Sequence, residues 1–395
     1  MDLNLQAPPI AAASEVSDVL LSLFVVILAA KIGDEIFKRL HQPTLIGEIL
    51  AGVIIGPAVL GIVEPNQTLE VFAELGVVFL LFWVGLETRL SDLAKVGGTA
   101  TRVGVFGMVL PLIAGFAGAQ VIGESTETSL FVGAALVATS VGITSAVLLD
   151  LKALKTKAAR TILGAAVIDD VLALVLLSIV VGIADTGGVD VVSILIVIGV
   201  SLAFLVFVGL GGIQVVRRWP DIFHAPRFAE SPLLPAIILC LGLAAIAAQI
   251  GLAAIIGAFL AGMIVAETRD QHDFEKEVAP LYAFFPPFFF AFIGLQVELS
   301  AFADPLILAA LIAVSVIAAA TKFAGAWLGA RALGARDALI VGVGMIPRGE
   351  VGIIVAGIGL TKGVIDGDVF TVIVGMSVLT TLVAPAMLKR LMERS

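Results

Sequence analysis

Two adjacent carboxylates, Asp169 and Asp170, stand in the middle of an otherwise apolar stretch, residues 165–173. The chain is 60% hydrophobic and 14% charged, and its mean hydropathy of +1.14 is that of a protein that lives in lipid. A charge at the bilayer centre costs about 3 kcal/mol or more, so intramembrane acids mark ion or proton sites that line a wet cavity. The alternative is an acid pair that serves only packing specificity.

Proton binding and metal-ion binding compete at such a pair. A carboxyl group that loses water, or that lies beside a second carboxylate, holds a proton more tightly. A site that takes either protons or a metal cation such as Na+ can couple one gradient to the other. We therefore expect Asp169 and Asp170 to bind the transported ion and its competing protons.

Lys322, within a later apolar stretch, is the candidate partner of this pair. Neighbouring helical residues point about 100° apart, so the two carboxylates cannot chelate one ion symmetrically. We expect one to face the ion and the other a protein partner, because a buried ammonium needs a counter-ion. The alternative is that the Lys322 side chain extends to the membrane surface, roughly 15 Å away.

Thirteen stretches approach the length of about 20 mostly apolar residues that a membrane helix needs. They are residues 17–38, 43–61, 69–87, 99–121, 128–149, 158–184, 190–216, 231–248, 250–267, 275–296, 303–332, 337–361 and 368–391. Most of the 23 basic residues fall in alternate loops, whereas the opposite loops carry mainly acids. Because cytoplasmic loops hold the excess of Lys and Arg, we expect the N-terminus outside and the C-terminus inside a bacterial-type inner membrane.

The chain also resembles itself at an offset of about 210 residues. Residues 46–52 match 256–262, Gly85 and Leu86 match Gly294 and Leu295, and Val141 to Ile143 match Val351 to Ile353. The offset equals seven spans, an odd number, so the two halves would insert in opposite directions. The sequence therefore predicts an all-α membrane protein with an inverted repeat of about five helices and a transport site near the midplane.

The fifth and twelfth spans are interrupted at matching places, by residues 139–144 and 344–350. Helices that break and cross there would leave opposed half-helix dipoles at the bilayer centre. We expect Arg348 and Glu350 to compensate these dipoles.

Five motifs taken together resemble the monovalent cation:proton antiporter-2 family, and within it the bacterial electrogenic Na+/H+ antiporters of the NapA type. The motifs are LIGE at 45–48, VGLE at 84–87, ATSVGIT at 138–144, VIDD at 167–170 and PRGEVG at 347–352. The resemblance implies a single transporter unit over residues 1–395 that moves by an elevator-like mechanism. It implies a core at about 99–184 and 303–391, a homodimeric scaffold at about 17–87 and 231–296, and a linking helix at about 190–216.

The same resemblance implies roles for single residues. Asp170 would bind the ion, Asp169 would pair with Lys322, and Thr139 would belong to the site at the crossing. The implied activity is exchange of one Na+ or Li+ for two protons, in the service of pH homeostasis. A K+/H+ antiporter is the alternative within the class, and a cation channel or regulatory membrane subunit the alternative outside it.

The sequence contains no phosphate-binding loop, metal-ligand cluster or nucleophile triad. We therefore expect a transporter and not an enzyme, with no cofactor and no nucleic-acid partner. Its partners would be Na+ or Li+, protons, the lipid bilayer and a second copy of the chain.

Overall fold

The computed structural model describes residues 10–186, 191–218, 233–267, 274–297 and 303–393, and every regular element in these ranges is a helix. Eight of the described helices are long and apolar enough to cross a membrane. Each of the predicted spans overlaps at least one described helix. The chain is thus an all-helical, multi-pass membrane protein.

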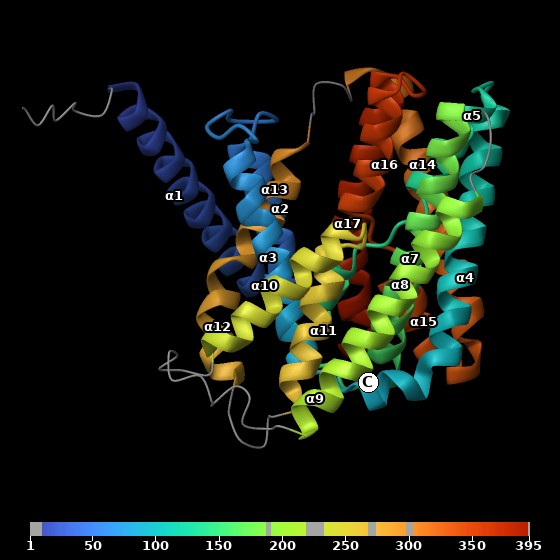
Figure 1. The fold of residues 1–395 in the computed structure, drawn as a ribbon. Helices are drawn as coiled ribbons and strands as arrows, with labels where there is room; N and C mark the ends of the chain where they lie inside the picture. Colours follow the sequence, from blue (N-terminus) through green and yellow to red (C-terminus); the bar gives the residue numbers. More distant parts are fainter. Residues whose placement is uncertain (1–9, 187–190, 219–232, 268–273, 298–302, 394–395) are drawn as a thin grey trace, which may run out of the picture.

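The first group of helices lies on the left of Figure 1 and comes from two separate parts of the sequence. Its members are α1 (Ile10–Arg39), α2 (Thr44–Ile55), α3 (Gln67–Leu86), α10 (Leu233–Gln249), α11 (Ala254–Ala266), α12 (Phe274–Phe284) and α13 (Pro286–Leu295). Helices α2 and α3 both pack against α13, and α3 also packs against α11. These contacts interleave the early and the late segments.

The second group lies on the right of Figure 1. Its members are α4 (Leu90–Val121), α5 (Thr126–Ala135), α6 (Val141–Asp150), α7 (Lys157–Thr186), α14 (Pro305–Ala330), α15 (Ala335–Gly344), α16 (Glu350–Thr361) and α17 (Gly367–Glu393). Helix α4 packs against both α7 and α14, so it joins the helix of the paired aspartates to the helix of Lys322. Helix α8 (Val191–Val206), the π-helical turn Phe207–Gly211 and α9 (Gly212–Arg218) follow α7 along the chain.

The span predicted at 99–121 begins earlier, at Leu90, and two other predicted spans end or divide at prolines. The span predicted at 43–61 is helical only to Ile55, because Gly56 takes an extended conformation and Pro57 has no N–H to donate. The span predicted at 275–296 is two helices, since Pro286 and Pro287 open a new helix at α13. Prolines at the break explain the latter two differences.

Close helix contacts follow the internal repeat. Gly85 of α3 packs against Gly262 of α11, and their counterparts, Gly294 of α13 and Gly52 of α2, pack against each other in the same way. A Cβ atom at any of the four positions would overlap the backbone of the facing helix. Small residues at these contacts are what allow two membrane helices to approach backbone to backbone.

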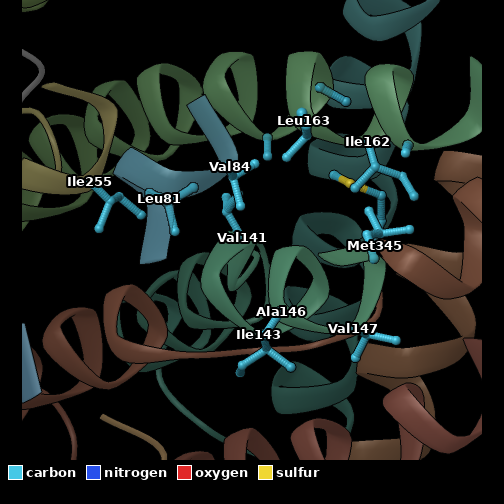
Figure 2. Packing of buried hydrophobic residues seen from close by; sticks show 14 of the residues in the cluster. Leu81, Val84, Val141, Ile143, Ala146, Val147, Ile162, Leu163, Ile255 and Met345 are labelled. Carbon is cyan, nitrogen blue, oxygen red and sulfur yellow. The ribbon is translucent and has the colours of Figure 1, made fainter. Parts of the chain in front are cut away.

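Helix α6 packs at the boundary between the two groups. Figure 2 shows apolar side chains of α6, including Val141 and Val147, among residues of α3, α7 and α11 such as Leu81, Ile162 and Ile255. This buried packing surrounds the place where α6 begins. It brings the broken fifth span next to helices of both groups.

Candidate functional site

Two helix interruptions meet inside the second group. Helix α5 ends at Ala135 and α6 begins at Val141, whereas α15 ends at Gly344 and α16 begins at Glu350. The two extended segments are hydrogen-bonded to each other, since the Ser140 N–H donates to the Pro347 carbonyl over 2.9 Å. The interruptions place non-helical backbone, with carbonyl groups free of helical bonds, deep inside the protein.

Asp169, Lys322 and Thr139 form a closed cluster beside this crossing. The Lys322 Nζ atom lies 2.9 Å from both carboxylate oxygens of Asp169. The Thr139 hydroxyl donates to Asp169 Oδ2 over 2.7 Å. Asp169 and Lys322 are 0% exposed, so protein groups surround the ion pair on all sides. A buried pair of this kind is held in place by its partners, because either charge alone would be very costly.

Lys322 also reaches the end of α5. Its Nζ atom donates to the Val137 carbonyl over 2.6 Å. The Arg348 guanidinium donates to the same carbonyl over 3.4 Å and to that of Ala138 over 3.1 Å. Cations placed at a helix C-terminus balance its partial negative charge. Two buried cations therefore balance the carbonyls that lie beyond the end of α5 and accept no helical hydrogen bond.

Arg348 ties two further helices, α14 and α17, to the crossing. Its Nη2 atom donates to the Ala318 carbonyl of α14 over 3.0 Å. Its own backbone is held by α17, with the Arg348 N–H donating to Thr380 Oγ1 and the Thr381 hydroxyl donating to the Arg348 carbonyl. The residue is 0% exposed. Glu350 begins α16, and its side chain lies outside the described residues.

Asp170 faces a different environment from Asp169. It is 6% exposed and borders a cavity of about 10 Å³. That cavity is lined on one side by residues of α6 and α7 and on the other by Leu81, Ile255, Ile256 and Phe259 of α3 and α11. The adjacent carboxylates therefore point apart, as their spacing on a helix requires. Asp170 lies at the boundary of the two groups, and Asp169 lies within the second group.

The structure joins four of the predicted site residues in one cluster. Thr139 and Lys322 both bond to Asp169. Lys322 and Arg348 both donate to the Val137 carbonyl. That carbonyl, of Val137, was not among the residues predicted from sequence. Every residue carries a carbonyl, and only the break in the fifth span indicates that this one is available. Thr380 and Thr381 were also not anticipated, because a threonine in an apolar helix ordinarily bonds within its own helix.

Comparisons with known proteins support one family. The profile described as "Sodium/hydrogen exchanger, transmembrane" matches residues 20–394. The Na(+)/H(+)-K(+) antiporter GerN of Bacillus cereus is 36% identical over 92% of this chain and 94% of its own. The high-affinity Na(+)/H(+) antiporter NhaS3 of Synechocystis is 33% identical over 95% of this chain and 90% of its own.

A solved structure shares the fold. The sodium proton antiporter MjNhaP1 of Methanocaldococcus jannaschii superposes with a TM-score of 0.65 over 94% of this chain and 97% of its own, at 20% identity. The similarity extends over nearly the whole of both chains, so it includes both groups of helices. The profile match and the sequence relatives show that this chain belongs to the family of transmembrane sodium/hydrogen exchangers.

Proposed function

We propose that the protein exchanges cytoplasmic Na+ or Li+ for external protons, with Asp170 as the ion ligand and the Asp169–Lys322 pair as a second proton-binding unit. The observation that carries this proposal is the difference between the surroundings of the two aspartates. Asp169 is enclosed with Lys322, whereas Asp170 borders a cavity between the helix groups. We therefore place the ion at Asp170, because binding it at Asp169 would break the buried pair with Lys322.

The proposed stoichiometry is the ratio that the family resemblance implies, with one proton released from each of the two units. When Na+ binds at Asp170, the carboxyl proton leaves. The second proton would come from the Asp169–Lys322 pair, which would lose the proton that it holds on Lys322 Nζ and be left as a carboxylate and a neutral amine. Two protons for one Na+ make the exchange electrogenic, and a membrane potential contributes about 2.3 kcal/mol per charge per 100 mV.

A larger cavity, of about 520 Å³, supports an access route from one face of the membrane. It lies between the two groups, and its lining includes Glu70 and Glu74 of α3 and, at the crossing, Arg348 and Gly349. Acidic walls raise the local concentration of cations. With the N-terminus outside, as the loop charges indicate, this cavity would open to the exterior of the cell.

The proposed movement is an elevator. The second group, residues 99–184 and 303–391, would slide as a core against a scaffold formed by 17–87 and 231–296, with 190–216 as the linking helix. Asp170 at the boundary between the groups supports this division, because sliding there would change which side of the membrane reaches its carboxylate. The proposal includes a homodimer formed through the scaffold and a location in the cytoplasmic membrane.

Proteoliposomes with an acidic interior and an internal pH-sensitive dye would test the exchange. Addition of external Na+ or Li+ should raise the internal pH, and Asp170→Asn should abolish the response. An imposed membrane potential should alter the rate if the exchange is electrogenic. A Na+ flux that is the same with and without a pH gradient would indicate a channel and reject the proposal.

K+/H+ exchange is the second candidate, favoured by the name of GerN, which includes K+ among its ions. The same assay distinguishes the two when Na+, Li+ and K+ are added in separate series. A response to K+ alone would replace the first proposal by the second. Lys322→Gln should change the number of protons per cation, and an unchanged ratio would assign the lysine a purely structural role.

A further inference from the structure

A third cavity, of about 640 Å³, lies within the second group and apart from the boundary that Asp170 faces. It is lined by residues of α4, α5, α14 and α17 and of the loops beside them. Its walls are almost entirely small or aliphatic, including Gly118, Val132, Ala310, Ala313, Ile317 and Ile373. A volume of several hundred Å³ with apolar walls is typical of a site for a drug-sized or single-chain ligand.

The rim of this cavity carries one sign of charge. Of the described residues that line it, the charged ones are Glu124, Asp366 and Asp368, all acids. Asp366 accepts a hydrogen bond from the Val369 N–H at the start of α17, which fixes that carboxylate at the rim. Glu124 follows the end of α4, so the acids sit where helices end and the apolar walls continue between the helices.

We propose that this cavity binds a single-chain alkylammonium amphiphile, with its chain between α4, α14 and α17 and its ammonium group beside Glu124, Asp366 and Asp368. The chain moves from lipid into an equally apolar cavity, so the head group decides which amphiphile is preferred. The carboxylates select the sign of the head group. A phosphate or sulfate head would meet three like charges at the rim, which disfavours it.

The site is separate from the proposed ion route. Its lining includes Leu136 and Ile317. The next residue in each case points its carbonyl away from the cavity, Val137 toward Lys322 and Ala318 toward Arg348. A bound chain would therefore contact residues next to the crossing without reaching Asp169 or Asp170. Binding can be measured with no reference to transport.

Photolabelling in proteoliposomes tests the proposal directly. The probe is a dodecyltrimethylammonium that carries a diazirine on its chain, and labelled peptides are mapped by mass spectrometry. Label should concentrate on α4, α14 and α17. Unlabelled dodecyltrimethylammonium should compete for it, whereas dodecyl sulfate and dodecanol at the same membrane concentration should not.

Gly118→Leu is designed to fill the cavity while it preserves the fold. A Cβ atom at Gly118 would meet only the Ile317 Cδ1 atom, at 3.9 Å, so a leucine there has room to extend into the cavity. Gly98→Leu is the matched control, since it lies on the same helix and a Cβ atom there meets nothing within 4 Å. Gly118→Leu should remove the specific label, and Gly98→Leu should leave it unchanged.

Neutralising the rim tests the selection of charge. Glu124→Gln and Asp368→Asn should each weaken competition by the alkylammonium about threefold, the size expected for partly exposed ion pairs. Glu64→Gln, in another loop, is the control. Specific label that persists in Gly118→Leu, or competition by dodecyl sulfate equal to that of the ammonium, would overturn the proposal.

Discussion

Lys322 loses its water shell entirely, and its ammonium group contacts three protein oxygens instead: two of Asp169 and the carbonyl of Val137. Lys322→Met would leave the Asp169 carboxylate buried without its counter-ion. We expect this variant to lose about 3 kcal/mol of stability. Adding Asp169→Asn should recover most of that loss, because an amide can be buried at far lower cost than an unpaired charge.

Thermal unfolding in one detergent would measure this coupling. Lys95→Met is a suitable control, since Lys95 pairs with Asp92 but is 71% exposed, and exposed pairs contribute little. A double variant as unstable as the sum of its two single variants would show that Lys322 and Asp169 do not stabilise each other.

The candidate site side chains could be found from the sequence because charge is rare in apolar stretches. Asp169, Asp170 and Lys322 stood out for that reason. The spacing of the two aspartates also required them to face different ways, which the structure shows. Which of them meets Lys322 came from a family resemblance, since helical geometry alone leaves the choice open. The role of the Val137 carbonyl could not be predicted from the sequence, because every residue has a backbone carbonyl.

At the scale of helices, Arg348 joins the elements that cross. Its guanidinium reaches the carbonyl of Ala138 after α5 and that of Ala318 in α14, and a lysine cannot span both. We therefore expect Arg348→Lys to lose about 2 kcal/mol, although the charge is kept. Arg336→Lys, at an exposed position, should have no effect on the unfolding temperature. Equal stability of the two variants would show that charge alone is what the crossing requires.

The repeat also makes a prediction about helices. Gly85→Val would force α3 away from α11, and Gly294→Val would force α13 away from α2, because both positions face backbone. Each substitution should destabilise the protein by about 2 kcal/mol, through overpacking at equivalent contacts. Gly98→Val, where a Cβ atom meets nothing within 4 Å, should be tolerated. Unfolding temperatures would test this, and a large difference between Gly85→Val and Gly294→Val would argue against equivalent packing in the two halves.

The length of the apolar stretches located the helices well but not every helix end. Length and hydropathy identified stretches that could cross a membrane, and the short repeat motifs aligned the two halves. The early end of α2 at Ile55 was missed, because the residues that follow are apolar and only Gly56 and Pro57 indicate a stop. The crossing of two broken spans was predicted from their matching interruptions. The hydrogen bond from Ser140 to Pro347 depends on three-dimensional packing that no spacing encodes.

At the scale of the whole molecule, two groups of helices meet at the cavity that Asp170 borders. An elevator requires these groups to slide, whereas a channel gated by a few side chains does not. Val167 of α7 and Ile255 of α11 line that cavity from opposite groups. A covalent link between them would therefore stop sliding without altering either aspartate.

Val167→Cys with Ile255→Cys, in a background where the single native cysteine is replaced by Cys240→Ala, provides this link. A short cleavable bis-thiol reagent should abolish Na+/H+ exchange in proteoliposomes, and cleavage of the reagent should restore it. Leu163→Cys with Val167→Cys is the matched control, because both lie on α7 four residues apart and a link within one helix leaves the groups free to move. Linked protein of the first pair that still exchanges at the unlinked rate would exclude relative movement of the two groups at this boundary, and transport would then have to proceed through rearrangement of side chains alone.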